Sequence, residues 1–224
     1  MASNKKIDRA MNGPGLFEIT LGVLLSLVLG VLLAALHLIF KPVTVVADKL
    51  PDTVERGDVY FVEGSTNSSK ARQVARKRQM LIDGGSAEVM FNEDELNSWI
   101  ATATEKAEAG AGAVAGIYEP ERINFRVRDS QLQIGLLGKL KTMGINQDLV
   151  FQTRGSFVAS PEGFRFTADE FYIGSLPTHV VPGLTPFLIS RIVAAQELPA
   201  DLQATWKKLK VVAVEGNSLR LVLP

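Results

Sequence analysis

A run of 22 residues without a formal charge, Ile19 to Phe40, constrains this chain more than any other feature. A helix needs about 20 apolar residues to cross the hydrocarbon core of a bilayer. The apolar part of a secretory signal is shorter, roughly 7–15 residues, and ends in a small-x-small cleavage site. The run instead ends in LHLIFKPVTVV, which has no such site. We therefore predict a retained transmembrane helix over residues 16–41.

Basic residues around the run predict its orientation. Three of them precede it closely and two follow it closely, namely Lys5, Lys6 and Arg9 before it and Lys41 and Lys49 after it. Cytoplasmic flanks carry an excess of lysine and arginine. A second basic cluster at residues 70–78 lies beyond the roughly 15–20 residues over which such charges count most. We expect a cell (inner) membrane protein with a cytoplasmic N-terminus and a periplasmic or extracellular C-terminal domain.

Four small residues recur every four positions inside the run: Gly22, Ser26, Gly30 and Ala34. At this spacing they form one ridge along a helix. Small side chains allow two helix backbones to approach closely, which favours association inside a bilayer. The ridge therefore predicts contact with another transmembrane helix, from a second copy or from a different subunit.

Composition argues against several kinds of chemistry. The chain has 24 basic and 24 acidic residues, no cysteine and two histidines. The balanced charge gives no overall attraction to nucleic acid. Without cysteine, disulfides, thiolate nucleophiles and cysteine metal sites are excluded. We expect no enzymatic activity, no metal and no cofactor, with membrane lipid and another transmembrane helix as partners.

The remaining sequence predicts one α+β domain. Helical spacing marks residues 69–83, where the preceding serines offer an N-cap, and the capping signature Asn92 with Glu95 opens a second helix. From residue 123 the apolar period changes to two, which predicts antiparallel strands through residue 173, then helices from 184 and from 199, and a terminal hairpin. We divide the chain into a disordered tail (1–15), the transmembrane helix (16–41), a stalk and basic helix (42–84) and an extracytoplasmic domain (85–224).

Two motifs imitate functional sites. The glycines of GAGAVAG, Gly110, Gly112 and Gly116, lie after a helix and before a strand, the reverse of a nucleotide-binding loop. His179 is near Ser175 and Asp169 in sequence, but no glycine-flanked serine elbow accompanies them. A structural role is the preferred interpretation of both, and a hydrolase is the weakest functional alternative.

The basic helix allows two interpretations. Its charges are carried by Lys70, Arg72, Arg76, Lys77 and Arg78. Acidic lipid headgroups attract such clusters, and Lys70, Arg72, Arg76 and Lys77 are the candidate contacts. A solvated helix face is the simpler interpretation, since no aromatic residues interleave the charges for nucleic-acid stacking.

Three stretches carry a resemblance to a known family. They are VMFNEDELNSWI, the hairpin INFRVRDSQLQIGLLG, and FRFTADEFYIGSLPTHVV, with the terminal hairpin in addition. Over roughly residues 85–224 their order resembles the YpmS-like family of single-pass bacterial membrane proteins. The resemblance implies a small relative of tubular lipid-binding domains, with a curved antiparallel sheet wrapped around a helix. By that analogy an apolar lipid groove would be lined by Phe125, Phe151, Phe157, Phe164, Phe166 and Phe171.

Two functions follow from these features. The first is an accessory or scaffold subunit of a membrane complex, which the small-residue ridge favours. The second is a membrane-anchored lipid-binding module, which the resemblance favours. An ordinary hydrophobic core explains the phenylalanines equally simply, because alternate apolar residues are what any half-buried sheet contains.

Overall fold

The structure is a computed structural model that describes residues 13–47, 53, 58–85, 88–106, 118–142, 144–161, 163–194 and 204–224. The chain divides into two compact units, Met1–Ile39 and Phe40–Pro224. The second unit therefore includes the segment 42–84 as well as the domain expected from residue 85 onward. The GAGAVAG loop, most of the N-terminal tail and the start of the helix expected at residue 199 lie outside the described residues.

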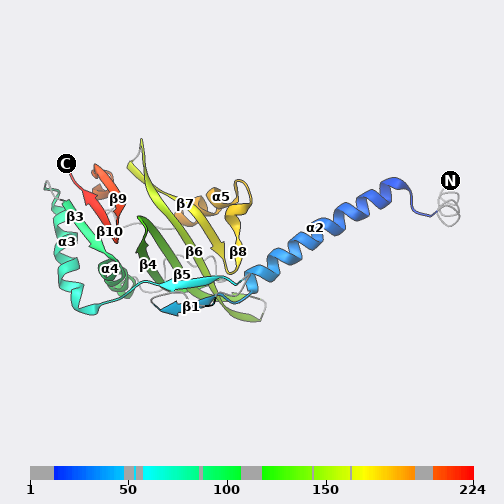
Figure 1. Cartoon of the computed structure of the whole chain (residues 1–224), viewed down its shortest axis with the longest axis horizontal. Coiled ribbons are helices and arrows are strands. Elements are labelled where there is room, and N and C mark those ends of the chain that lie inside the picture. Colours follow the sequence, from blue (N-terminus) through cyan, green and yellow to red (C-terminus); the bar gives the residue numbers. More distant parts are fainter. Residues whose placement is uncertain are drawn as a thin grey trace. The chain divides into compact units, whose positions relative to one another are not determined.

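The elements follow one another along the chain in the order in which Figure 1 colours them. The helices are α2 (Leu16–Phe40), α3 (Ala71–Asp83), α4 (Glu93–Lys106) and α5 (Leu184–Ala194), with short 3₁₀ helices η1 (Ser68–Lys70) and η2 (Thr178–Val180). The strands are β1 (Thr44–Ala47), β2 (Tyr60–Glu63), β3 (Glu88–Asn92), β4 (Tyr118–Arg128), β5 (Gln131–Thr142), β6 (Ile145–Ser160), β7 (Gly163–Ile173), β8 (Leu176–Pro177), β9 (Val211–Glu215) and β10 (Ser218–Val222).

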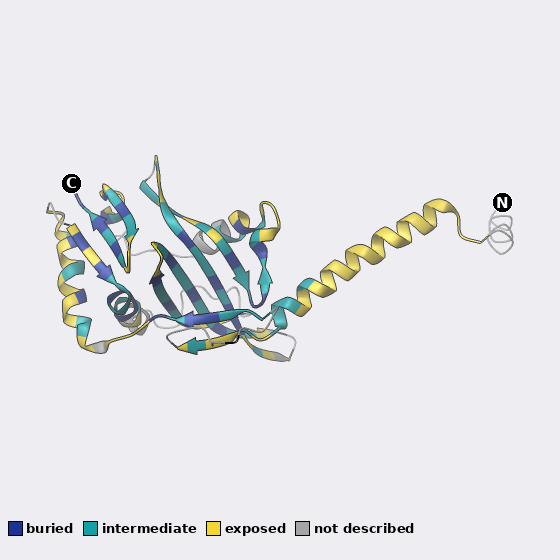
Figure 2. Cartoon of the chain, viewed as in Figure 1, coloured by how far each residue is buried: buried dark blue, intermediate teal, exposed yellow. Residues whose placement is uncertain are grey.

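Helix α2 confirms the helix expected over residues 16–41. It is 25 residues long, has a mean hydropathy of 2.8 over its most apolar window and contains no buried residue. Among the described residues it is the one helix that is long and apolar enough to cross a membrane. Figure 2 shows its surface as exposed along almost its whole length.

The fold class is α+β, as the change of period predicts. Strands β4 to β8 form an antiparallel five-stranded sheet in chain order, and β3, β10 and β9 form an antiparallel three-stranded sheet. Strands β1 and β2 form a separate pair, and that pair is parallel. No pattern in the sequence predicts β2 or this pairing.

The main core lies between the two larger sheets and helices α3 and α4 (Figure 2). Its fully buried members include Phe91 of β3 and Val127 of β4, both with 0% exposure. The two tryptophans, Trp99 and Trp206, pack against it, and Trp206 donates its indole N–H to the carbonyl oxygen of Phe164 at 2.8 Å. Both helical and strand elements therefore depend on the same apolar cluster.

The ends of the helices confirm one expected cap and correct another. The N–H of Glu95 donates to Oδ1 of Asn92 at 3.0 Å, and the N–H of Asn92 donates to a Glu95 carboxylate oxygen at 2.9 Å, which is the predicted capping box. Helix α3 ends at Gly84 in the left-handed conformation, with φ 70°. The expected serine cap of α3 is wrong: Lys70 is the N-cap, without a side-chain hydrogen bond, because Asn67 instead accepts both the N–H and the hydroxyl of Ser69.

Candidate functional site

The ridge of small residues on α2 is continuous and exposed. Gly22, Ser26, Gly30 and Ala34 all lie in one unbroken helix, and all four are exposed. A Cβ added at Gly22 or at Gly30 would meet nothing within 4 Å. Among the described residues, nothing lies close enough to Gly22 or Gly30 to clash with an added side chain, so helix α2 itself leaves the ridge exposed.

The first two residues of the second unit, Phe40 and Lys41, are bound within that unit. The carbonyl oxygen of Phe40 accepts a hydrogen bond from Nε2 of Gln147 at 2.5 Å, and that of Lys41 accepts one from the Ser175 hydroxyl at 3.3 Å. The amine of Lys41 also pairs with Asp58 at 2.7 Å. Sequence reasoning missed these contacts because 107 and 134 residues separate the hydrogen-bonded partners.

The six phenylalanines named for a lipid groove share one face of the five-stranded sheet. Phe125, Ile134, Thr153 and Phe171 are opposed across β4 to β7, and Phe151 lies two residues from Thr153. The other three, Phe157, Phe164 and Phe166, pack against the same core cluster as Phe125 and Ile134. The structure thus brings all six together on one surface.

Most of that surface is already covered. Phe125, Phe157, Phe164 and Phe166 pack against the main core, and Phe171 is only 4% exposed. The ring of Phe151 is half-buried and meets the ring of Tyr118 edge to face, with centroids 5.0 Å apart. These contacts match the ordinary-core interpretation of the phenylalanines.

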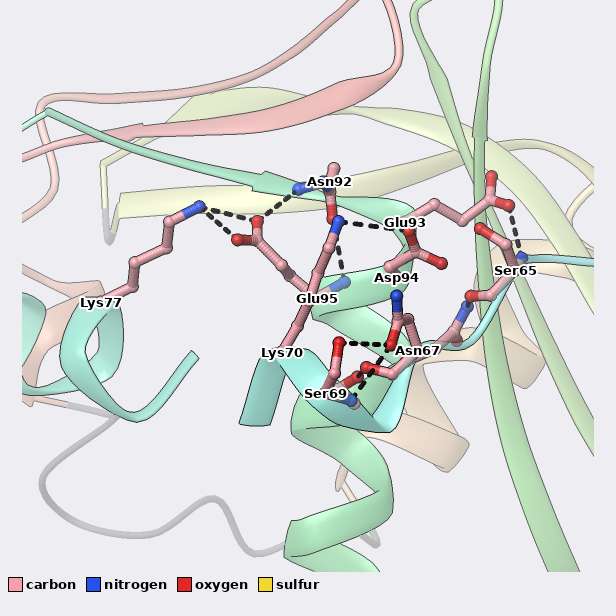
Figure 3. Close-up of polar contacts among 11 residues, drawn as sticks. Ser65, Asn67, Ser69, Lys70, Lys77, Asn92, Glu93, Asp94 and Glu95 are labelled. Atoms are coloured by element: carbon pink, nitrogen blue, oxygen red, sulfur yellow. Dashed lines mark hydrogen bonds and ion pairs between the residues drawn. The ribbon is translucent and has the colours of Figure 1, made fainter. Parts of the chain in front are cut away.

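The candidate headgroup contacts on α3 divide into two kinds. The amines of Lys70 and Lys77 pair with Asp94 at 3.3 Å and with Glu95 at 2.7 Å, both on α4 (Figure 3). Arg72 and Arg76 lie on α3, and both are exposed. Lys77 therefore joins α3 to α4, and Lys70 joins η1 to α4. Headgroup contact stays a prediction that rests on the two arginines.

Polar side chains at the start of α4 cover the edge of β4. Asn97 accepts the N–H of Phe125 at 2.7 Å and donates to its carbonyl oxygen at 2.8 Å, as a neighbouring strand would. Glu93 accepts the N–H of Val127 at 2.9 Å through one oxygen and the N–H of Ser65 at 2.6 Å through the other (Figure 3 shows the contact with Ser65). Because an exposed edge invites pairing with another chain, these residues protect the sheet.

A small cavity of mixed polar and apolar lining lies beside this edge. Its volume is about 230 Å³, and it is lined by residues of β2, α4 and β4 with the loop between β2 and η1. Two of its lining residues, Arg122 of β4 and Glu63 of β2, form an ion pair. The cavity is smaller than the roughly 300–1,000 Å³ of typical ligand pockets. The charges of Arg122 and Glu63 in its lining neutralise each other.

The residues of the imagined triad have separate partners. Nδ1 of His179 lies 3.3 Å from both the N–H and the carbonyl oxygen of Phe171. The Ser175 hydroxyl donates to Lys41, and Asp169 accepts a hydrogen bond from Gln131 at 2.9 Å. Within the described ranges, moreover, no group of three or more histidines and carboxylates could hold a metal ion.

Seven groups of the described domain have shifted pKa values, among them Tyr118, Asp94 and Arg126. Burial raises the pKa of the Tyr118 phenol far above its usual value, and the charge of Glu121 adds to this effect. The hydrogen bond from Ser65, followed by that from Lys70, lowers the pKa of the Asp94 carboxyl despite its partial desolvation. Burial lowers the pKa of the Arg126 guanidinium, with Arg128 as the next cause. Each shift has a structural cause, and none lies in a cleft with a nucleophile.

Comparison of the chain with protein families, with curated proteins and with solved structures finds no match. The described residues form one apolar helix and one α+β unit.

Proposed function

We propose that this protein is a non-enzymatic, single-pass membrane protein that acts as an accessory or scaffold subunit of a membrane complex. The observation that carries the proposal is the exposed small-residue ridge on an apolar helix of 25 residues. A helix that served only as a tether would need apolarity and length, but it would not need an open ridge of small residues.

The attachment of the domain supports the same role. Phe40, the last residue of α2, is already part of the folded unit and is hydrogen-bonded by Gln147. Because the folded unit follows α2 directly, a partner helix that binds the ridge would bring this unit into the same complex. In the proposed orientation the N-terminus is cytoplasmic and the domain is periplasmic or extracellular, which the three basic residues before the helix favour.

The ridge is tested by two matched substitutions in the full chain. Gly30→Ile places a bulky, branched side chain on the ridge. Leu27→Ile is the control: it lies off the ridge and exchanges one apolar side chain for another of the same size. Both variants should insert into membranes as the parent does, because neither introduces a polar group. We expect Gly30→Ile to lose most crosslinking and co-purification with its partner in mild detergent, since a bulky side chain separates the two backbones.

Equal association of the parent, Gly30→Ile and Leu27→Ile would contradict the scaffold role of the ridge. A partner of the same size as the chain would identify self-association, and a larger or smaller polypeptide would identify a different subunit. Both results support the proposal, because each needs the ridge.

A lipid-binding module is the second candidate. It is favoured by the six phenylalanines on one face of the sheet and by the resemblance to the YpmS-like family. Phe151 is the most useful test position, because it is half-buried and lies outside the main core cluster. If the face holds an acyl chain, lipid that co-purifies with the parent in stoichiometric amount should be absent from Phe151→Asp. Delipidated parent with unchanged stability would contradict this second function.

A further inference from the structure

A second apolar surface lies on the domain, where η2 meets α5. Its exposed members are Val180, Val181 and Phe187, with exposures of 65%, 47% and 55%. The two prolines between them, Pro182 and Pro186, are also exposed. Apolar side chains of this size gather in no other ten-residue stretch of the described domain with comparable exposure.

The segment that carries this surface contains no formally charged residue. No aspartate, glutamate, lysine or arginine occurs from Phe171 to Ser190. A surface meant only for water would carry charges at some of its exposed positions. The apolar side chains and the missing charges together fit an uncharged, apolar environment.

The 3₁₀ helix η2 is hydrogen-bonded to β7. The hydroxyl of Thr178 donates to the carbonyl oxygen of Phe171 at 3.0 Å and lies 3.1 Å from the hydroxyl of Thr185. Thr178 and Thr185 are 0% and 6% exposed. The buried pair thus links η2, which precedes Val181, to the first turn of α5, which carries Phe187.

The same segment begins beside the exit of α2. Ser175, which donates to the carbonyl oxygen of Lys41, is three residues before Thr178. If α2 spans the bilayer, Phe40 and Lys41 lie at the bilayer surface, because the apolar helix ends there. The turn from β7 to β8 then lies at that surface too, and η2 follows within a few residues.

We propose that the η2–α5 surface, defined by Val180, Val181 and Phe187, is a second membrane contact that inserts into the interfacial region of the bilayer. The inference rests on the proposed membrane anchoring by α2. Shallow insertion of a few apolar side chains is a common way for proteins to lie on a membrane. Together with α2, this contact fixes the domain against the bilayer and limits its rotation about Lys41.

The natural absence of cysteine makes a direct test possible. Single cysteines at Val181, Phe187, Met80 and Leu27 of the full chain are labelled with an environment-sensitive fluorophore, and each variant is reconstituted into phosphatidylcholine vesicles. Met80 is the matched control, because it is apolar and 49% exposed, and α3 lies at the opposite end of the domain from β8 (Figure 1). Quenching is measured with aqueous iodide and with lipids that carry a spin label on the acyl chain.

We expect labels at Val181 and Phe187 to lose iodide quenching and to be quenched by the spin-labelled lipid, while the label at Met80 behaves in the opposite way. Iodide quenching at Val181 and Phe187 as strong as at Met80 would overturn the inference. Protection from iodide without quenching by lipid would also overturn it, since another protein surface would then cover these residues. The label at Leu27 separates the two proposals: its lack of lipid quenching would overturn the anchor itself, whereas its quenching leaves the anchor in place whatever the other labels report.

Discussion

The amine of Lys77 on α3 donates to both carboxylate oxygens of Glu95 on α4, at 2.7 Å each. Glu95 is 1% exposed, and its side chain also accepts the N–H of Asn92. A buried carboxylate that has lost its cation is strongly unfavourable. The pair therefore joins the basic helix to the capping box that opens α4, which explains why a lysine of an otherwise solvated face is fixed in place.

Lys77→Met should lower the free energy of unfolding by about 2–4 kcal/mol, because it leaves the Glu95 carboxylate buried without its cation. Lys77→Met combined with Glu95→Gln should lose less than Lys77→Met alone, because the amide needs no counter-charge. Urea unfolding followed by tryptophan fluorescence reports the difference, since Trp99 and Trp206 pack against the core. Arg72→Met, at an exposed position of α3, is the control, and an equal loss in both single variants would contradict the role of the pair.

Gly135→Ala should destabilise the domain by roughly 1–3 kcal/mol, because a Cβ at this position would overlap the ring of Phe61, which is 0% exposed. Adding Phe61→Leu should recover part of the loss by shortening the side chain opposite. Gly85→Ala serves as the control, since an added Cβ there meets nothing within 4 Å. Thermal unfolding in detergent measures all four proteins, and a neutral Gly135→Ala would contradict the close packing of β2 on β5.

Tyr118→Phe should make the domain less sensitive to alkaline pH. The pKa of Tyr118 is raised in the folded domain, so its contribution to stability is present below the unfolded value of about 10 and is lost as the pH rises from there toward the folded pKa. At neutral pH the variant loses the hydrogen bond from the phenol to the carbonyl oxygen of Leu136, a cost of about 0.5–1.5 kcal/mol. Melting temperatures between neutral and alkaline pH should therefore converge for parent and variant, and parallel curves would contradict the burial of the phenol.

Much of the fold follows from periodicity alone. The alternation of apolar and polar residues from Ile123 and from Leu132 predicts the hairpin of β4 and β5, and the structure pairs Phe125 with Ile134 and Arg126 with Gln133. Helical spacing predicts α3 and α5, and Asn92 with Glu95 predicts the start of α4. These patterns lie within single elements or between neighbouring strands, so they can be recognised without knowing the tertiary structure.

What the sequence could not predict depends on distant partners. Strand β2 is four residues long and pairs with β1 in parallel, which no turn motif announces. The separation between Ser175 and Lys41 likewise hides the contact that holds the exit of α2. For the candidate sites, the six phenylalanines share one face of the sheet, but only the packed structure reveals that four of them pack against the main core, that Phe171 is buried and that Phe151 meets Tyr118. A lipid groove on this face stays a prediction.

Orientation is predicted from the basic residues before α2. A single cysteine at the exposed Met80 should react with a membrane-impermeant maleimide added to intact cells, after permeabilisation of any outer layer. A cysteine at Ser3 should react only after the membrane is lysed. Labelling in the reverse order would mean that the domain is cytoplasmic, and the parent chain, which has no cysteine, gives the background.

The most direct measurement of the central claim is extraction of cell membranes with alkaline carbonate, which removes peripheral proteins and leaves spanning ones. The full chain should stay in the membrane pellet with its N-terminus intact. Leu24→Arg with Leu32→Arg should move it to the supernatant, because each arginine near the middle of a spanning helix costs about 2.5–3.5 kcal/mol of insertion. Release of the parent chain by carbonate, or a mature protein that begins after Phe40, would contradict a retained anchor.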